Sequence, residues 1–314
     1  MAMQQPEETA TDPLSPVSPD ANPVSPNASP EAAAVPAAEH SGDLRAGETV
    51  KRHRVSTRLW HWTNALALFV MLLSGLMIFN AHPRLYWGQY GANFDHAWFE
   101  IGSHGDAGFA KLGALQVKTT GLLGVWPDAH GVIQHRAFPY WLTIPSTYSL
   151  AHARLWHLAF AWILGLGLVG YLVISLVNGH ARRDLAPTRH EIAPAHIWQD
   201  IKDHARLRFP TGAEAARYNI LQKLSYGLVL FVLLPLIIFT GLTMSPQMDS
   251  GWSFLLSIFG GRQSARSIHF IVAWLLVGFF FVHVVMVVLA GPINEVRSMI
   301  TGRYRLPREK GAGS

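Results

Sequence analysis

Four histidines lie within long stretches of the chain that carry no charged side chain: His61, His157, His269 and His283. Imidazole binds iron, copper and zinc, and it exchanges protons near neutral pH. An ionisable side chain is unfavourable in an apolar segment, so its presence there marks a candidate functional site. These four residues are therefore the first candidates for metal binding or proton transfer.

The segments that hold the histidines are long enough to cross a lipid bilayer. Each belongs to a run of at least 25 residues without Asp, Glu, Lys or Arg, in a chain that is 50% hydrophobic and only 14% charged. About 20 apolar residues in a helix span the hydrocarbon core, where every backbone group must pair internally. We therefore predict an all-α membrane protein with a bundle of four transmembrane helices at about 58–80, 154–177, 220–244 and 266–290.

The distribution of Lys and Arg predicts the orientation of the bundle. The two terminal segments and the loop between the second and third helices hold 18 of these residues, against 7 in the other two loops. Basic segments favour the cytoplasmic side. Both termini are then cytoplasmic, and the long non-cytoplasmic loop between the first two helices faces the periplasm if the cell is Gram-negative. The net charge of +5 includes no long basic block, so no nucleic-acid partner is expected.

In this orientation the histidines fall at two depths. His61 opens the first helix and His283 lies late in the fourth, so both are at the inner level. His157 and His269 lie early in helices that enter from outside, so both are at the outer level. The 14 residues from His269 to His283 advance a helix by about 21 Å and turn it by about 1400°, some 40° short of four turns. One face of the fourth helix therefore carries an imidazole at each depth.

Two imidazoles at one depth can fill both axial positions of a haem iron, which then transfers electrons rather than binding oxygen. The chain has no cysteine, so it cannot itself hold an iron–sulfur cluster or a covalently attached haem. We therefore predict two b haems, one between His157 and His269 and one between His61 and His283. The alternative for each histidine is a buried hydrogen bond to a neighbouring helix.

Three arginines each precede a candidate ligand by three residues: Arg58, Arg154 and Arg266. Residues at this spacing share a helix face, so each guanidinium lies one turn nearer the membrane surface. An arginine there can bind a haem propionate through charge-assisted hydrogen bonds. The alternative is that these side chains only extend toward the interface from a helix end.

Three other histidines are also candidate ligands. His152 could replace His157, but it lies five residues earlier and points about 140° away on a helix. We therefore prefer His157. His130 and His135 in the long loop could bind a metal, although no third ligand is apparent.

The candidate residues resemble those of the bacterial four-helix di-haem cytochrome b subunits of nickel–iron hydrogenase, formate dehydrogenase and thiosulfate reductase. The resemblance rests on the motif HWTN at 61–64, on His157, on NILQK at 219–223 and on the spacing of His269 and His283. It covers about residues 50–306. It implies an electron-transfer subunit of an oxidoreductase complex in the bacterial inner membrane, which links a quinone pool on the cytoplasmic side to an outward-facing redox enzyme.

The resemblance also implies where the quinone binds. In the formate dehydrogenase relatives an Asn of the N-x-x-Q-K stretch lies near the quinone, and here that residue is Asn219, with Gln222 and Lys223 as further candidates. These residues begin the third helix at the inner level, where an amide can hydrogen-bond a quinone carbonyl. Capping of the helix end is the alternative. The C-terminal half looks most like the thiosulfate-reductase branch, whose members resemble partners of periplasmic molybdopterin oxidoreductases.

The remaining segments divide the chain into three parts. Residues 1–48 contain eight prolines and are predicted to be a disordered cytoplasmic tail, 49–306 form the membrane domain, and 307–314 are a second cytoplasmic tail. The long loop contains five aromatic residues that could dock a partner or anchor the chain at the lipid interface: Trp87, Trp98, Trp126, Tyr140 and Trp141.

Two other functions are compatible with the sequence. The protein could be a stand-alone quinone oxidoreductase that acts on a small oxidant or on superoxide. It could also be a non-haem transporter or a passive membrane anchor in which the histidines form a proton or metal path.

Overall fold

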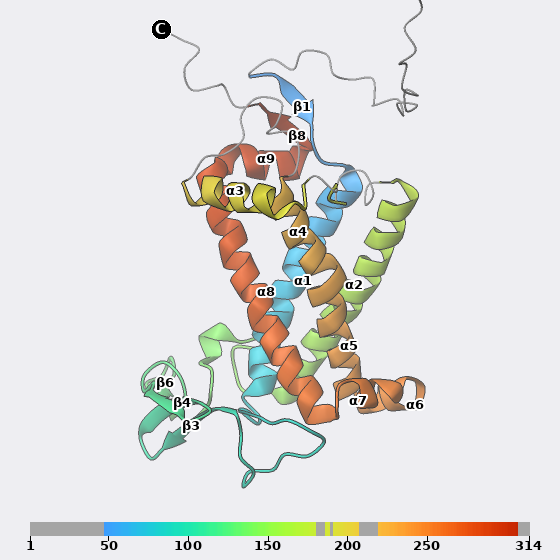
Figure 1. Ribbon diagram of the computed structural model, residues 1–314. Coiled ribbons are helices and arrows are strands. Elements are labelled where there is room, and N and C mark those ends of the chain that lie inside the picture. Colours follow the sequence, from blue (N-terminus) through green and yellow to red (C-terminus); the bar gives the residue numbers. More distant parts are fainter. Residues whose placement is uncertain (1–46, 180–185, 189–190, 207–218, 307–314) are drawn as a thin grey trace, which may run out of the picture. The chain divides into compact units, whose positions relative to one another are not determined.

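Four long apolar helices dominate the described part of the chain (Figure 1). They are α1 Val55–Phe79, α2 Leu150–Val177, the composite span Ile220–Met244 and α8 Arg262–Ala290, and each is long and apolar enough to cross a membrane. At most 39% of the most apolar window of any span is buried inside the protein. Apolar surface of this extent is not stable in water, so the chain is a multi-pass membrane protein. The four predicted helices are confirmed, and three of the four begin up to four residues earlier than predicted.

The computed structural model describes residues 47–179, 186–188, 191–206 and 219–306. The tails predicted at 1–48 and 307–314 lie outside the described residues, apart from Gly47 and Glu48. All described residues belong to one unit, Leu44–Ser314.

The third span changes its helical geometry at mid-length. It consists of α4 Ile220–Leu228, the π-helical turn η4 Val229–Leu233 and α5 Leu234–Met244. Pro235 lies in the first turn of α5, where its missing N–H and its ring interrupt the regular hydrogen bonds. A π turn before such a proline accommodates the interruption without ending the span.

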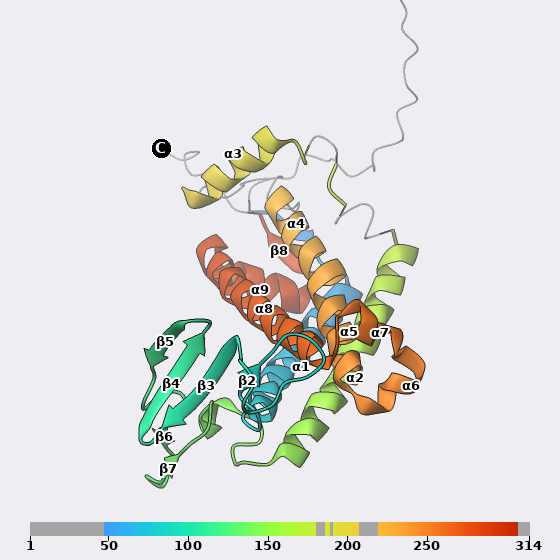
Figure 2. The same cartoon turned by 60° about the horizontal axis from the view of Figure 1, so that its bottom comes forward.

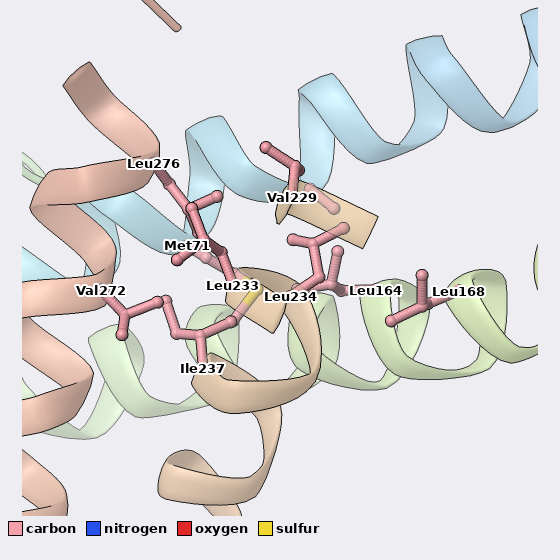
Figure 3. Close-up of a cluster of buried hydrophobic side chains, with 10 residues drawn as sticks. Met71, Leu164, Leu168, Val229, Leu233, Leu234, Ile237, Val272 and Leu276 are labelled. Carbon is pink, nitrogen blue, oxygen red and sulfur yellow. The ribbon is translucent and has the colours of Figure 1, made fainter. Parts of the chain in front are cut away.

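Buried apolar side chains from all four spans meet in a layer at mid-depth (Figure 3). On α8 this layer contains Val272 and Leu276, which lie between His269 and His283 in the sequence. The other members of the layer come from the remaining spans: Ala67, Met71, Leu164, Leu168, Val229, Leu233, Leu234 and Ile237. The layer therefore separates the two histidine levels and holds the spans together between them.

The segment between α1 and α2 is not an irregular loop. It contains the antiparallel sheet β2–β3–β4–β5, with strands Arg84–Leu85, Phe99–His104, Ala107–Leu112 and Leu115–Lys118. The hairpins turn at Gly105 and Gly113, whose φ values of 56° and 58° suit glycine. A second, two-stranded ladder joins β6 Trp126–Pro127 to β7 Ile133–Gln134. The prediction of an all-α chain is therefore wrong for this segment, because tight glycine turns let short strands pair there.

Hydrogen bonds fasten this segment to the start of α8. The Trp98 indole donates to Ser267 Oγ at 2.9 Å, and that hydroxyl donates to the Tyr86 carbonyl at 2.6 Å. The Gly88 amide donates to Ser264 Oγ at 2.7 Å. An apolar cluster that includes Leu85, Ile101 and Phe138 packs the same segment against the end of α1. We call this end of the bundle the sheet end.

The opposite end of the bundle carries both ends of the described chain, and we call it the terminal end (Figures 1 and 2). Strand β1 Thr49–Lys51 pairs antiparallel with β8 Arg303–Arg305. Arg52 forms an ion pair with Glu295 of α9 Pro292–Thr301, at 3.2 Å. The amphipathic helix α3 Pro194–Ala205 also lies at this end, beside α4.

Four shorter helices complete the described elements. The 3-10 turn η1 Tyr140–Leu142 precedes α2. Between α5 and α8 the chain forms η5 Pro246–Met248, α6 Asp249–Trp252 and α7 Phe254–Ile258, at the sheet end. Neither region holds a candidate membrane span among the described residues.

The Asn80 side chain connects the end of α1 to the segment before α2 by hydrogen bonds. It is only 2% exposed. Its amide donates to the Phe138 carbonyl at 2.9 Å and accepts from the Phe138 amide at 2.7 Å. Asn80→Ala leaves two buried backbone groups unpaired, which costs about 1–3 kcal/mol each. We expect hydrogen exchange at the Phe138 amide to accelerate about 10- to 100-fold. The exposed asparagine at the end of α2, Asn178, supplies the control Asn178→Ala, and equal exchange in both variants would contradict this role.

Candidate functional site

The structure brings the four histidines together as two pairs. His61 of α1 lies beside His283 of α8, with 6.3 Å between ring centroids, near the terminal end. His157 of α2 lies beside His269 of α8, with 6.2 Å between centroids, near the sheet end. The ring planes are inclined by 56° in both pairs. These are the pairs that depth predicts, and we call them the terminal pair and the sheet pair.

The ring spacing fits two imidazoles on opposite sides of one metal ion. A metal–nitrogen bond of about 2.0–2.1 Å on each side places such ring centroids about 6.3 Å apart. Rings joined by a direct hydrogen bond would lie only about 5 Å apart. Among the described residues no group of three or more His, Cys, Asp or Glu side chains could hold a metal ion. A metal held by two protein ligands needs its remaining positions filled from elsewhere, as a porphyrin does for iron.

The sheet pair is fixed by hydrogen bonds from neighbouring helices. His157 Nδ1 lies 3.0 Å from the Met71 carbonyl oxygen and 3.2 Å from Ser74 Oγ, both of α1. His269 Nδ1 lies 3.0 Å from Thr240 Oγ1 of α5. Each imidazole is therefore held at Nδ1, and its Nε2 remains for a ligand.

The terminal pair has a different environment. His283 stacks on Phe279 at 5.9 Å, and Trp62 lies edge-on to His61 at 5.1 Å. His61 Nδ1 and Asn64 Oδ1 are buried, and neither has a hydrogen-bond partner among the described residues. Buried polar atoms are normally paired, so two unpaired ones beside a candidate ligand indicate that a further group binds there.

The three candidate arginines lie in three different environments. Arg58 has a buried Nε without a partner in the described chain, close to the terminal pair in sequence. Arg154 is exposed on α2. Arg266 donates to the His82 carbonyl and lies 5.7 Å from the Phe79 ring centroid, so it also joins α8 to the segment after α1. A guanidinium has five donors, which leaves Arg266 further ones. Propionate binding by the three stays a prediction.

The candidate quinone residues at the start of α4 have structural partners. Asn219 is the N-cap: its side chain accepts from the Gln222 amide at 2.8 Å, and Gln222 Oε1 accepts from the Asn219 amide at 3.3 Å. This reciprocal capping box satisfies two free donors of the helix end. Lys223 forms an ion pair with Glu191 at 2.8 Å. The capping alternative is therefore present, and a quinone contact from these residues stays a prediction.

The other loop and helix-end histidines lie apart from the two pairs. His152 is exposed, and its Nδ1 lies 3.1 Å from Ser149 Oγ at the start of α2. His157, not His152, is the α2 histidine that lies beside His269. His135 contacts Ser103 at 3.3 Å, and no metal-binding group forms around it or His130 in the described residues.

A comparison with protein families identifies the bundle. Residues 52–302 match the family model described as prokaryotic cytochrome b561. The chain belongs to this family. Membership implies a b-type haem and electron transfer in a membrane.

Two curated relatives are informative. The chain is 23% identical over 282 residues to the probable Ni/Fe-hydrogenase B-type cytochrome subunit of Cupriavidus necator, a match that covers 84% of this chain and 91% of the relative. It is 27% identical over 154 residues to the putative protein-methionine-sulfoxide reductase subunit YedZ1 of Azospira oryzae, covering 48% of this chain and 74% of the relative. No solved structure matches.

The ion pair of Lys223 predicts a pH dependence. The hydrogen bonds from Lys223, more than any other contact, lower the pKa of Glu191 to about 2 from its usual 4.5. A lowered carboxyl pKa stabilises the fold above the unfolded-state pKa, and this contribution is lost as the pH falls from about 4.5 toward 2. We expect Lys223→Met to lower stability by about 0.2–1 kcal/mol at neutral pH, because the pair is partly exposed.

The measurement is thermal unfolding of wild type and Lys223→Met in the same detergent across the acidic range. The difference in stability between the two proteins should be constant at about pH 5–8 and should shrink below about pH 4.5. In a Glu191→Gln background, Lys223→Met should change little at any pH. A wild-type advantage that persists unchanged to about pH 3 would rule out the ion pair as its source.

Proposed function

We propose that this protein is the membrane electron-transfer subunit of an oxidoreductase complex, carrying electrons between the quinone pool and a periplasmic, molybdopterin-dependent redox partner through two b haems. The observation that carries the proposal is the pair of matched histidine sites, at 6.2 and 6.3 Å, built on one helix. The names of both curated relatives describe subunits of oxidoreductases, one of a hydrogenase and one of a methionine sulfoxide reductase. That likeness supports an oxidoreductase partner.

The residues that would hold the haems are the two pairs. His157 and His269 would ligate a haem at the sheet end, and His61 and His283 would ligate one at the terminal end. A haem held by two imidazoles would supply single-electron transfer. The step of 14 residues along α8 places the two levels about 21 Å apart, across most of the hydrocarbon core. The apolar layer between them excludes water and ions from this path.

The quinone would bind beside the terminal pair, which we place at the cytoplasmic face of the bacterial inner membrane. The two terminal segments and the loop between the second and third spans hold 18 Lys and Arg residues, against 7 in the other two loops, and this excess supports the orientation. Asn64 Oδ1, which is buried and has no hydrogen-bond partner in the described part of the chain, is a further candidate contact beside Asn219, Gln222 and Lys223. An asparagine side chain also carries an amide donor, which suits a quinone carbonyl.

The periplasmic partner would dock at the sheet end. Of the five loop aromatics, Trp126 is only 3% exposed and donates to the Arg136 carbonyl, and Trp98 bonds Ser267. Trp87 and Trp141 are exposed by 54% and 74%. These two are therefore the better candidates for contact with the partner or with lipid headgroups.

The decisive experiment is a reduced-minus-oxidised visible spectrum of the purified protein with its haem-to-protein ratio. We expect sharp b-haem bands and two haems per chain. His269→Ala and His283→Ala should each lose one haem, because each removes one axial ligand from a different pair. His152→Ala is the matched control and should retain both.

Several results would contradict the proposal. A protein without b-haem bands would favour the transporter or anchor function. Retention of two haems in both ligand variants would show that the axial ligands lie elsewhere. Rapid reaction of the purified chain with quinol and a small oxidant, without any partner, would favour the stand-alone oxidoreductase.

A further inference from the structure

Two buried hydroxyl residues on different helices contact the sheet pair in the same way. Ser74 of α1 lies 3.2 Å from His157 Nδ1, and Thr240 of α5 lies 3.0 Å from His269 Nδ1. Both hydroxyl residues have no exposed surface. Each belongs to the helix that packs along the one that carries its histidine, α1 along α2 and α5 along α8. The contact therefore recurs on both sides of the sheet pair.

The hydrogen bonds of the two hydroxyls decide where the imidazole proton lies. Ser74 Oγ donates to the Val70 carbonyl at 2.7 Å, with the Met71 carbonyl as a second acceptor at 3.2 Å. Thr240 Oγ1 donates to the Leu236 carbonyl at 2.7 Å, with the Ile237 carbonyl as a second acceptor at 3.1 Å. When each hydroxyl donates to a carbonyl, its oxygen accepts from the histidine, so Nδ1 carries the proton and Nε2 the free lone pair.

A backbone carbonyl independently places the proton of His157 on Nδ1. The Met71 carbonyl oxygen lies 3.0 Å from His157 Nδ1, and a carbonyl can only accept. The Ile237 carbonyl holds the corresponding position on α5: it precedes Thr240 by three residues, as Met71 precedes Ser74, and lies 3.1 Å from Thr240 Oγ1. The Nδ1–H of His157 is thus shared between a hydroxyl and a carbonyl of one helical turn.

A glycine follows each hydroxyl and brings the ring close to the helix backbone. The Cε1 atom of His157 lies 3.4 Å from the place of a Cβ on Gly75, and that of His269 lies 3.5 Å from the corresponding place on Gly241. The edge of each ring therefore rests against a backbone, next to the residue that holds its Nδ1. The tautomer of the ring is set by the hydroxyl and by the carbonyl one turn earlier. The position of the ring is set by its close approach to the glycine.

We propose that Ser74 and Thr240 are positioning residues that hold His157 and His269 as Nδ1–H tautomers, and that they lower the reduction potential of the haem at the sheet pair. The inference rests on the proposed bis-histidine haem. A partner that accepts from Nδ1–H makes the coordinating nitrogen more basic, which favours the oxidised iron. The terminal pair lacks this support at His61, whose Nδ1 has no partner in the described chain.

A purely structural role for these hydroxyls is the competing explanation. Ser and Thr in helices commonly donate to the carbonyl four residues earlier. Thr243 does this on the same helix, with a 2.8 Å bond to the Phe239 carbonyl, and it is only 1% exposed. Among the described residues, no hydrogen bond joins Thr243 to a histidine. Thr243→Val therefore removes an equivalent buried hydroxyl without touching the sheet pair.

The test compares Thr240→Val with Thr243→Val by redox titration and by low-temperature EPR of the oxidised protein. We expect Thr240→Val to shift the oxidised-to-reduced ratio of one haem by about two- to tenfold toward reduction, an increase of about 18–59 mV in its midpoint potential. Its low-spin ferric signal should also shift, since the ring is less firmly oriented. The other haem, and both haems of Thr243→Val, should be unchanged.

Two further variants keep the inference testable. Thr240→Ser retains the hydroxyl and should restore the wild-type midpoint. Ser74→Ala removes the corresponding contact with His157 and should also raise the midpoint potential of the haem at the sheet pair. If the Thr240→Val protein does not accumulate, Ser74→Ala alone tests the inference. Haem-loaded Thr240→Val and Ser74→Ala with the midpoints and EPR signals of Thr243→Val would overturn the inference. Wild-type protein without two haems would instead refute the proposed function.

Discussion

The periodicity of a single helix, α8, sets the positions of both histidine pairs. Its two histidines are 14 residues apart, which is close to four turns, so both imidazoles leave nearly the same face. The helices α1 and α2 then need to supply only one imidazole each at the matching depth. A residue inserted between the two positions would rotate one imidazole by about 100° relative to the other. The spacing within α8 thus determines whether both imidazoles can face the same side of the helix.

The two ends of α8 differ in what surrounds them. At the sheet end, Ser264 and Ser267 connect the helix to the sheet segment immediately before His269, while Thr240 holds the imidazole itself. At the terminal end His283 stacks on Phe279, and His61 Nδ1 and Asn64 Oδ1 have no hydrogen-bond partner among the described residues. Protein hydrogen bonds therefore organise the sheet pair more completely than the terminal pair.

The spans and the pairing of the histidines could be predicted because both depend on strong sequence signals. Uncharged runs of 25 residues have few alternatives to a spanning helix, and depth follows from direction. The sheet between α1 and α2 could not be predicted with the same rule, because strands such as β2 have only two residues and show no alternation. The glycines at 105 and 113 were the available signal for its hairpins.

The hydroxyl contacts were missed for a different reason. A serine or threonine in an apolar span is usually a small residue that packs against a neighbouring helix. The recurrence of a hydroxyl residue followed by glycine at 74–75 and 240–241 becomes informative only once both are seen against a histidine. In contrast, the capping box of Asn219 and Gln222 has a readable pattern, Asn-x-x-Gln before an apolar run.

The pairing of β1 with β8 has a consequence for biosynthesis. Strand β1 precedes the first span and is made before any of the bundle, whereas β8 follows the last span. Because α8 contributes to both histidine pairs, neither pair exists on the ribosome until the fourth span has been inserted. The pairing of β1 with β8 also requires the fourth span, because β8 is made after it. Both histidine pairs and the β1–β8 ladder can therefore form only after α8 has been made, late in the synthesis of the membrane domain.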